Sequence, residues 1–472
     1  MMVLWDRQTL LTAINGFVIG ALPETFSGVS IDSRTLIEGD IFFCIKGHHL
    51  DGHDFAMHAY KQGAGVLVIE QNHLEEMKKI GAPLIVVPDV LQALESLAQA
   101  ARKRSTAKII AVTGSVGKTT TKDILQHVLK SVGKVHANLA SLNNCWGVPL
   151  TLARLPEDCD YAIFEIGMNH KDEIRPLVKL VRPHVALITH IAAGHMEFFK
   201  NIEEIANAKA EIFEGLSDNG VAVLNADSDF FSYLIHKAKQ YGVKNIVSFG
   251  EAHCADYQAK EIRLLADCSC MLARISSHNA MIKIGAPGRH IVQNSLGVIA
   301  ACDAVGADIT RVIFSLSSFS LPKGRGIRYQ LSLPGGGEFR LIDESYNANP
   351  ASMRAALNLL ATGPVGEKGR RIAVLGDMLE LGDYSEKLHR ELVDPIGHSG
   401  ANPVFLIGKE MKFLAMDLPA SVRVHYAEYI EEILPLIFAE VSNGDLVMIK
   451  SSHSICLSRI VTEMFNRYKV IS

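Results

Sequence analysis

The sequence predicts a three-domain α/β protein, and three observations lead to this prediction. The chain has 472 residues, which is too many for one hydrophobic core and suggests about three domains of roughly 100 to 200 residues. Hydrophobic residues make up 48% of the chain and charged residues 21%, as in an ordinary globular protein. Short apolar runs alternate with amphipathic stretches of helical period, a pattern typical of parallel sheets covered by helices.

The first predicted domain, a small α/β unit, covers residues 1–104. Apolar runs predict strands at 41–45, 65–70 and 83–88, because each is short and rich in β-branched or aromatic side chains. The stretch VLQALESLAQAARKR follows with helical period and a basic end. We place the first boundary after this helix.

The central domain is predicted over 105–325 and the third over 326–472. KIIAVTG, YAIFEIG, HVALITHI and GVAVLNAD each contain the unbroken apolar run of a strand buried on both faces. A doubly wound parallel sheet is therefore expected in the central domain. After the turn-rich segment LPKGRG, the runs RLIDESYN, RIAVLGDM, PVFLIG and DLVMIK predict a second, Rossmann-like sheet.

Charge and composition exclude several classes of partner. The net charge is -4, the sequence pI is near 6.6, and no long basic run is present, so nucleic acid is not expected as a partner. No stretch approaches the roughly 18 to 20 apolar residues of a membrane span, and the first residues do not resemble a signal peptide. The eight scattered cysteines suggest reduced thiols. We expect a cytoplasmic protein that acts on small molecules.

A phosphate-binding loop is predicted where the strand KIIAV runs into TGSVGKTT and a helix. Backbone N–H groups and the helix amino end would surround phosphate oxygens, with Lys118 adding a charge and Thr119 a hydroxyl for Mg²⁺. Val112 stands where the usual pattern GxxxxGK[ST] has its first glycine, so a chance glycine turn is the alternative. The expected ATP-binding residues of this loop are Thr113, Gly114, Ser115, Val116, Gly117, Lys118 and Thr119.

Three further residues suggest a magnesium site at the carboxyl ends of the central strands. Glu165 ends the strand of YAIFEIG, and His195 lies in the loop after the next strand. Taken alone, Glu165 suits a solvated strand end and His195 an ordinary loop histidine. Lys209 lies on the apolar stripe of the helix NIEEIANAKAEIFEGL, where a lysine must reach the surface, pair with a charge or change chemically.

These motifs, in their order, resemble the Mur ligase family. TGSVGKTT, NNCWGVPLTL, EIGMNHKDEI, HIAAGHMEFF, AKAEIFEGL and LNAD are similar to the family's central domain, and IDSRTLIEGDIFFCIKGHHLDGHDFA to its UDP-binding domain. The resemblance implies an ATP-dependent ligase of bacterial wall synthesis that forms an acyl phosphate and then joins it to an amine. DESYNANPASMRAAL and VLGDMLELG are most similar to members that join D-alanyl-D-alanine to UDP-N-acetylmuramoyl-tripeptide. These two substrates and a monomeric enzyme are expected.

The resemblance also implies roles for individual residues. Two Mg²⁺ ions would be held by Thr119, Glu165, His195 and a carbamylated Lys209, and Lys118, Lys209 and His195 would be catalytic. Besides the loop, the positions that match family contacts to ATP are Asn294, Arg325, Asp343 and Glu344, of which either acid could meet the ribose. The positions that match substrate contacts are Ser33, Arg34, Lys46, Gly47, Asn143, Asn144, Tyr346, Asn347 and Asn349.

Some residues depart from the family pattern or have a simpler explanation. Asn349 followed by Pro350 is a typical helix start. His453 stands where the family usually has an arginine, and His190 where it has an asparagine. The segment LASL lengthens the usual single residue before Asn143. The local geometry at these places is therefore open.

Three alternatives remain. A ligase that adds the third residue of the stem peptide would usually carry a D-N-P-R signature, which is missing. The related folylpolyglutamate synthases usually differ at SYNAN. A nucleotide-binding switch or transport ATPase would need the phosphate loop alone, without a UDP-type domain or the lysine at 209.

Overall fold

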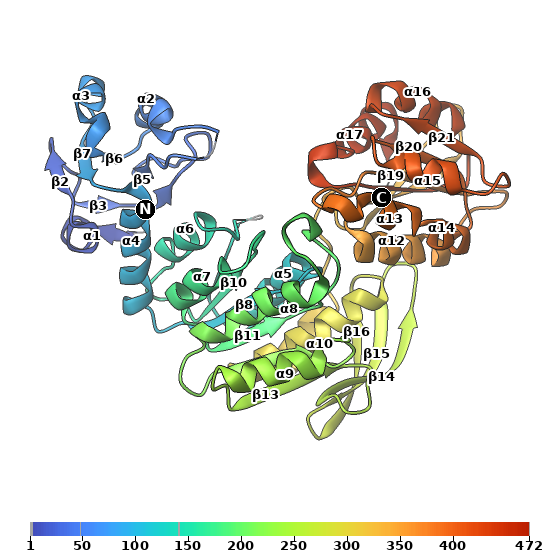
Figure 1. The fold of residues 1–472 in the computed structure, drawn as a ribbon, viewed down its shortest axis with the longest axis horizontal. Helices are drawn as coiled ribbons and strands as arrows, with labels where there is room; N and C mark the ends of the chain where they lie inside the picture. The colour runs from blue at the N-terminus through green and yellow to red at the C-terminus, as the bar shows by residue number, and fades with distance from the viewer. Residues whose placement is uncertain (1–2, 48, 140–141, 472) are drawn as a thin grey trace.

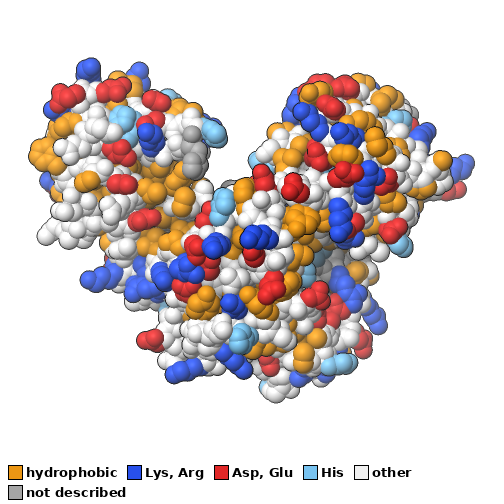
Figure 2. All heavy atoms as spheres, in the orientation of Figure 1, with side chains coloured by type: hydrophobic (Ala, Val, Ile, Leu, Met, Phe, Trp, Pro, Cys, Tyr) orange, Lys and Arg blue, Asp and Glu red, His pale blue; other side chains and the backbone are white. Residues whose placement is uncertain are grey.

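The computed structural model describes residues 3–47, 49–139 and 142–471. Figure 1 shows three lobes, with the amino-terminal and carboxy-terminal lobes on opposite sides of the central one. In the space-filling view the molecule is hollowed between these two outer lobes (Figure 2). Two residues of the LASL segment, 140 and 141, lie outside the described residues, so the effect of its length stays open.

The amino-terminal lobe is built on a mostly parallel sheet of strand order β2-β7-β6-β5-β4. Its strands are β2 (Phe17–Ile19), β4 (Val29–Ser30), β5 (Ile41–Phe43), β6 (Val66–Glu70) and β7 (Leu84–Val87). Beside them lie the small strands β1 (Trp5–Asp6) and β3 (Thr25–Phe26) and the helices α1 (Arg7–Ile14), α2 (Ala56–Lys61), α3 (Leu74–Met77) and α4 (Val90–Arg104). The strands expected at 41–45, 65–70 and 83–88 and the helix after them are confirmed.

The amino-terminal and central lobes share one hydrophobic core. The buried ring of Trp5 donates its Nε1–H to the carbonyl of Ala153 at 3.0 Å. The guanidinium of Arg104, at the end of α4, lies 3.7 Å from the centre of the same ring. Buried side chains from both lobes form one continuous cluster, so these two lobes are rigidly packed. The boundary after residue 104 stays a prediction.

The central lobe contains a sheet of strand order β16-β15-β14-β13-β12-β11-β8-β10-β9. Its strands are β8 (Lys108–Thr113), β9 (Val135–Ala137), β10 (Tyr161–Glu165), β11 (Val185–Ile188), β12 (Val221–Asn225), β13 (Asn245–Gly250), β14 (Tyr257–Leu264), β15 (Ser269–Ile275) and β16 (His278–Ile284). Its helices are α5 (Lys118–Leu129), α6 (Gly147–Ala153), α7 (Ile174–Val181), α8 (Ile202–Ala210), α9 (Phe231–Gln240), α10 (Arg289–Ala304) and α11 (Ile309–Leu316).

Helices cover both faces of this sheet, as the apolar strands predict. Along β8, Ile109 and Ala111 belong to the core cluster on one face, whereas Ile110 and Val112 belong to the cluster on the other. Side chains of α6, α7 and α8 fill the first cluster, and side chains of α5, α10 and α11 fill the second. The doubly wound arrangement is therefore confirmed.

The sheet is not parallel throughout, which corrects the sequence prediction. β15 pairs antiparallel with both β14 and β16. The loop between β15 and β16 has only two residues, and the first of them, Ser276, has a φ of 51°. Such a short connection can join only antiparallel strands. The helix expected to run through residue 216 also changes, because it ends at Ala210 and continues as the 3₁₀ helix η5 (Glu211–Gly215).

The carboxy-terminal lobe has a sheet of strand order β21-β20-β19-β22-β18-β17-β23, with separate hydrophobic cores on its two faces. Its strands are β17 (Ile327–Ser332), β18 (Glu338–Glu344), β19 (Arg371–Gly376), β20 (Ala401–Ile407), β21 (Val424–Ala427), β22 (Leu446–Lys450) and β23 (Lys469–Val470). Its helices are α12 (Pro350–Thr362), α13 (Ser385–Arg390), α14 (Val393–Ser399), α15 (Met411–Asp417), α16 (Ile430–Glu440) and α17 (Ser458–Arg467). The boundary at 325/326 stays a prediction.

No helix among the described residues is long and apolar enough to cross a membrane. The eight cysteines are free thiols.

Candidate active site

The phosphate loop joins the end of β8 to the start of α5. Gly117 precedes the helix with a φ of 85°, a left-handed conformation that favours glycine. The Nζ of Lys118 donates to the carbonyl of Gly114 at 2.8 Å, so the lysine folds back over the loop. Thr119 follows in the first turn of α5. The expected order of strand, glycine loop and helix is confirmed.

The neighbouring strand β11 fixes the loop. The hydroxyl of Thr189 donates to the carbonyl of Val116 at 2.6 Å, and the backbone N–H of Ser115 donates to the carbonyl of His190 at 2.7 Å. His190 thus supports the loop through its backbone, which any residue at this position can do. This explains how a histidine can replace the family's asparagine without disturbing the loop.

Glu165 lies at the end of β10, directly beside β8 in the sheet. Its side chain is buried, and Oε1 accepts a hydrogen bond from the side-chain amide of Asn143 at 2.7 Å. Oε2 is buried without a hydrogen-bond partner among the described residues. A buried carboxylate oxygen without a partner is costly in the absence of a ligand and fits a site for a hard cation.

Lys209, in the last turn of α8, is fully buried. Its Nζ has no hydrogen-bond partner within the part of the chain that the structure describes. Burial lowers the pKa of Lys209 well below its usual range, and the nearby charge of Lys118 lowers it further. Both effects favour the uncharged form of the amine, and the alternative of a lysine reaching the surface is wrong.

The charged groups around Lys118 come from the central lobe, from the segment before β17 and from the carboxy-terminal lobe. Burial lowers the pKa of Lys118, the carboxylate of Glu165 opposes this, Arg325 adds to the lowering, and Glu380 opposes it. The charge of Lys118 in turn lowers the pKa of Lys209. The phosphate loop, the end of β10, α8 and two segments near the carboxy-terminal lobe therefore share one electrostatic neighbourhood.

His195 contacts a residue that the sequence did not single out. Its Nδ1 lies 2.7 Å from Oε2 of Glu380, in the loop after β19, although the geometry at Nδ1 is not that of a straight hydrogen bond. Interaction with His195 lowers the pKa of the Glu380 carboxyl. Glu380 lies within VLGDMLELG, so the motif was visible in the sequence, but its partner in another lobe was not.

The expected adenine contacts lie at the other side of the loop. A Cβ placed on Gly117 would be 2.9 Å from Oδ1 of Asn294, so this asparagine of α10 touches the loop. The guanidinium of Arg325 lies 4.0 Å from the ring centre of Tyr346, and the ring of His453 lies 5.4 Å from that of Tyr346. The ring of His453, in place of the family's arginine, thus lies tilted beside Tyr346, whose ring also contacts the guanidinium of Arg325.

The two neighbouring acids at the end of β18 have different surroundings. Asp343 is buried, and its carboxylate accepts hydrogen bonds from the N–H of Gly324 and from both the N–H and hydroxyl of Ser345. Its oxygens hold the turn before β17. Glu344 is less buried and pairs with the Nζ of Lys450 at 3.2 Å. Of the two, Glu344 is better placed to meet a ligand.

Asn347 and Asn349 lie between β18 and α12. The carbonyl of Asn347 accepts a hydrogen bond from the Nζ of Lys450 at 2.9 Å, and its side chain is exposed. Asn349 caps α12, because its Oδ1 accepts the N–H of Ser352 at 2.9 Å. Its amide nitrogen would lie 4.0 Å from a Cβ on Gly194, beside His195. The cap role of Asn349 is confirmed, and its role toward a substrate stays a prediction.

The remaining substrate candidates are spread over two lobes. Asn144 is exposed, and its Oδ1 accepts the N–H of Gly147, the first residue of α6, at 2.9 Å. Arg34 is exposed and pairs with its neighbour Asp32 at 2.7 Å. Gly47 approaches the central lobe, since a Cβ there would lie 3.3 Å from the ring of Trp146.

Ser33 is buried, whereas Lys46 is exposed. No contact in the structure brings Ser33, Arg34 or Lys46 to the phosphate loop within the described ranges. Their role in binding a UDP group stays a prediction.

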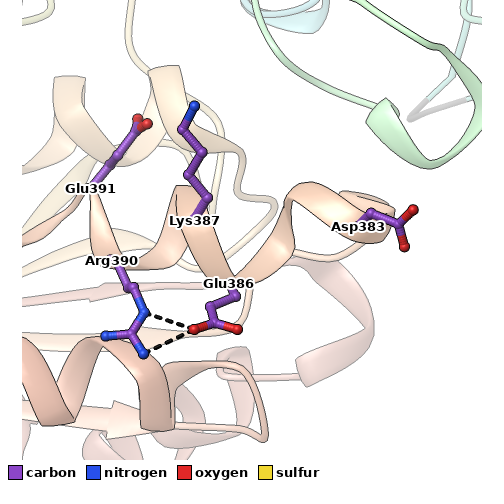
Figure 3. Close-up of a pocket in the computed structure, with 5 residues that line it drawn as sticks. All are labelled: Asp383, Glu386, Lys387, Arg390 and Glu391. Carbon is purple, nitrogen blue, oxygen red and sulfur yellow. Dashed lines mark hydrogen bonds and ion pairs between the residues drawn. The ribbon is translucent and has the colours of Figure 1, made fainter.

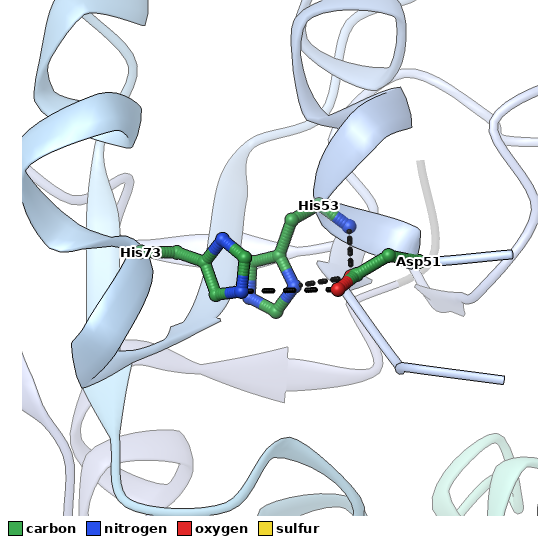
Figure 4. A group of neighbouring side chains, drawn as sticks. All are labelled: Asp51, His53 and His73. Carbon is green, nitrogen blue, oxygen red and sulfur yellow. Dashed lines mark hydrogen bonds and ion pairs between the residues drawn. The ribbon is translucent and has the colours of Figure 1, made fainter.

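A cluster of two histidines and one aspartate lies in the amino-terminal lobe, apart from the phosphate loop (Figure 4). Asp51, His53 and His73 have potential metal ligands close together, and the two imidazole rings stack at 3.8 Å. However, Nε2 of His53 accepts the N–H of Glu70 at 3.0 Å, and its Nδ1 lies 2.6 Å from Asp51. Both nitrogens of His53 are engaged, so the cluster is a structural hydrogen-bonded group.

A surface depression on the carboxy-terminal lobe also lies apart from the predicted residues (Figure 3). Charged side chains line it, and Arg390 pairs there with Glu386 at 2.9 Å. The lining residues are Asp383, Glu386, Lys387, Arg390 and Glu391.

Comparison with known proteins gives matches along nearly the whole chain. Residues 25–102 match the catalytic domain of the Mur ligase family, residues 112–302 the Mur ligase middle domain, and residues 328–453 the Mur ligase glutamate ligase domain.

Similar relatives and a similar structure agree with these matches. The UDP-N-acetylmuramoyl-tripeptide--D-alanyl-D-alanine ligase of Rickettsia prowazekii is 35% identical, covering 97% of this chain and 99% of the relative. The enzyme of the same name from Escherichia coli is 33% identical, covering 96% of each. The crystal structure of MurF from Acinetobacter baumannii superposes with a TM-score of 0.85 at 28% identity, covering 98% of this chain and 99% of that one. The chain therefore belongs to the Mur ligase family.

Proposed function

We propose that this chain uses ATP to join D-alanyl-D-alanine to UDP-N-acetylmuramoyl-tripeptide. Its full-length similarity to relatives named for this reaction carries the proposal. The product is the pentapeptide precursor of peptidoglycan, so the chain would serve cell-wall synthesis and, through it, cell shape and division. Action as a monomer in the cytoplasm, expected from the sequence, is part of the proposal.

The reaction needs a strong positive field at the γ-phosphate. The tripeptide carboxylate attacks the γ-phosphorus, ADP leaves, and an acyl phosphate forms. The amine of the dipeptide then attacks the acyl carbon, and phosphate leaves. Lys118, folded over the loop by its bond to Gly114, is placed to donate to the phosphate oxygens as charge develops on them. No covalent bond to the protein is required.

The donor set beside the loop fits Mg²⁺. Thr119, Glu165, His195 and a carbamylated Lys209 would hold two ions, which when bound neutralise phosphate charge and polarise the reacting oxygens. Two observations support the fit: an unpartnered carboxylate oxygen on Glu165 and an unpartnered, buried nitrogen on Lys209. The oxygen of Glu165 is free to bind a cation, and the nitrogen of Lys209 is free to form the carbamate.

Carbamylation of Lys209 follows from its burial. An uncharged amine has a free electron pair that can form a bond to the carbon of CO₂, with release of one proton to solvent. The product is an anion whose oxygens suit Mg²⁺. The lowered pKa of Lys209 supports this step, because it removes the need to deprotonate an ammonium first.

The substrates would lie in the hollow between the outer lobes (Figure 2). Asn294 and Arg325 would contact the adenine, and Glu344 the ribose, with Asp343 supporting the turn. Ser33, Arg34, Lys46 and Gly47 would bind the UDP group. The acceptor and the peptide would meet Asn143, Asn144, Tyr346, Asn347 and Asn349.

A panel of acceptors tests the proposal. ADP release is measured with UDP-N-acetylmuramoyl-tripeptides that carry either lysine or diaminopimelate as third residue, together with D-alanyl-D-alanine or single amino acids. We expect release only with a tripeptide and the dipeptide together. Turnover of a UDP-muramoyl dipeptide with a single amino acid would instead assign the third-residue ligase.

A further inference from the structure

We propose that Glu380, in the carboxy-terminal lobe, is a positioning residue that orients the imidazole of His195 in the central lobe. The magnesium site would then be complete only when these two lobes are docked. This inference rests on the proposed function, because it assigns His195 to the metal.

The contact between the two side chains carries the inference. Nδ1 of His195 lies 2.7 Å from Oε2 of Glu380. A neutral imidazole has one N–H and one nitrogen with a free electron pair. A carboxylate can only accept, so the close approach of Oε2 favours the tautomer with the proton on Nδ1, although the angle at Nδ1 is not that of a straight hydrogen bond. Nε2 is then left free to bind a cation, as in metal sites where a carboxylate supports a ligating histidine.

Backbone contacts hold both partners in place. The N–H of Glu197 donates to the carbonyl of Glu380 at 3.2 Å, and the hydroxyl of Tyr384 donates to the carbonyl of Lys200 at 2.9 Å. Gly382 packs directly on the opposite loop, since a Cβ there would lie 2.9 Å from the Cα of Glu197. The loop 195–200 and the loop 380–384 therefore form a specific docking contact between two lobes.

Both side chains also start from an uncommon backbone conformation. His195 has a φ of 57° and Glu380 a φ of 63°. Residues other than glycine rarely adopt this left-handed region, and such positions persist where the surroundings hold them and often mark functional sites. His195 and Glu380 both have this conformation and lie opposite each other across the boundary between two lobes. We infer that the left-handed backbone at both positions serves the contact between their side chains.

The charges around the pair favour the same arrangement. The carboxylate of Glu380 also raises the pKa of Lys118, so it lies within electrostatic range of the phosphate loop. Its side chain is 48% exposed and that of His195 26%, so both remain accessible to a ligand in the hollow. Burial alone therefore does not fix the imidazole, which leaves Glu380 as the group that orients it.

The tautomer is measured first, in the absence of metal and substrate. Protein with ¹⁵N-labelled histidine rings is studied by NMR, and the His195 signal is assigned by its loss in His195→Gln. We expect the Nδ1–H form in the native protein and in Glu380→Gln, whose amide oxygen can still accept. In Glu380→Ala we expect a mixture of tautomers. An unchanged tautomer in Glu380→Ala would overturn the inference.

Metal affinity is measured next, with Mn²⁺ titrated into the protein and a non-hydrolysable ATP analogue and followed by electron paramagnetic resonance. We expect about 10- to 100-fold weaker binding in Glu380→Ala and a smaller loss in Glu380→Gln. Glu386→Ala removes an exposed carboxylate from the same lobe and should bind Mn²⁺ normally. Equal affinity of Glu380→Ala and the native protein would overturn the inference.

The two proposals can fail separately. If His195→Gln binds Mn²⁺ normally, His195 is no ligand, and the metal assignment in the proposed function fails together with this inference. If His195→Gln weakens binding but Glu380→Ala does not, only the inference fails. If Glu380→Ala unfolds at a lower temperature than Glu380→Gln, the tautomer and the Mn²⁺ affinity of both variants are measured below that temperature.

Discussion

The side-chain amide of Asn143 donates to Oε1 of Glu165 at 2.7 Å, and Oε2 of the same carboxylate is left without a partner. One hydrogen bond thus fixes the rotation of the carboxylate and leaves one oxygen free. The backbone N–H of Glu165 is held in turn by Asn138 at 2.7 Å. A residue predicted to order the substrate therefore also supports a predicted Mg²⁺ ligand.

Replacing Asn143 with alanine should weaken the binding of Mg²⁺ more than it changes folding. Without the amide, the Glu165 carboxylate can rotate, and supports of this kind are worth about 10- to 100-fold in metal affinity. We expect the Mg²⁺ concentration for half-maximal ADP formation to rise by that factor. Asn245→Ala, which removes an exposed asparagine at the start of β13, is the matched control. An unchanged Mg²⁺ dependence in Asn143→Ala would show that Glu165 does not need this bond.

Replacing Lys118 with alanine should abolish most activity. The lysine supplies charge at the γ-phosphate, and loss of one such group costs about 10²- to 10³-fold in turnover. The control is Lys108→Ala, an exposed lysine at the start of β8, which should keep full activity. Initial rates of ADP release at saturating substrates give the comparison, and near-normal turnover of Lys118→Ala would mean that phosphate binds elsewhere.

Replacing Lys209 with alanine should give a folded but nearly inactive protein. The native amine is buried, and burial lowers its pKa well below the usual range, which favours the uncharged form. Its removal leaves no unpaired charge in the core. Formate or acetate, entering the vacated space as an anion, should restore part of the activity of Lys209→Ala.

Two results would contradict the carbamate at Lys209. The first is full activity of Lys209→Ala. The second is a native crystal structure grown with bicarbonate in which the Nζ is an unmodified amine. Mass spectrometry is less suitable here, because carbamates are lost in acid.

Replacing Asn349 with alanine should lower stability through the cap of α12. Its side chain accepts the N–H of Ser352, and the hydroxyl of Ser352 accepts the N–H of Asn349 at 2.9 Å. Loss of such a cap costs about 0.5 to 2 kcal/mol in the free energy of unfolding. This change in the free energy of unfolding is measured by urea unfolding, followed by the spectroscopic change that accompanies unfolding of the carboxy-terminal lobe. Asn349→Asp, which can still cap, should retain most of the stability and separates the cap from any contact with substrate.

Apolar patterning was enough to predict most of the strands. β8, β10, β11 and β12 lie where unbroken apolar runs end in polar residues, because strands buried on both faces need such runs. α4 was predicted with its bounds, since its basic last turn and regular apolar period agree. The antiparallel β14, β15 and β16 were missed, because their hairpin depends on a two-residue loop with few sequence signals.

The sequence could not predict which residues of different lobes contact each other at the site. Lys209 stood out by its place on an apolar stripe, but only the fold shows that its Nζ is fully buried. Asp343 and Glu344 were equivalent in the sequence, and the hydrogen bonds of the turn before β17 distinguish them. Glu380 belongs to a motif in the chain, yet its role depends on which loop of the central lobe faces it.

The most direct test of the account follows oxygen from the tripeptide to the phosphate. UDP-N-acetylmuramoyl-tripeptide with both oxygens of its reacting carboxylate labelled with ¹⁸O is turned over with ATP and D-alanyl-D-alanine, and the released phosphate is analysed by mass spectrometry. An acyl phosphate predicts one ¹⁸O atom in each phosphate, and release only when the dipeptide is present. Unlabelled phosphate, or phosphate release that ignores the dipeptide, would contradict the assignment of this chain as a ligase of D-alanyl-D-alanine.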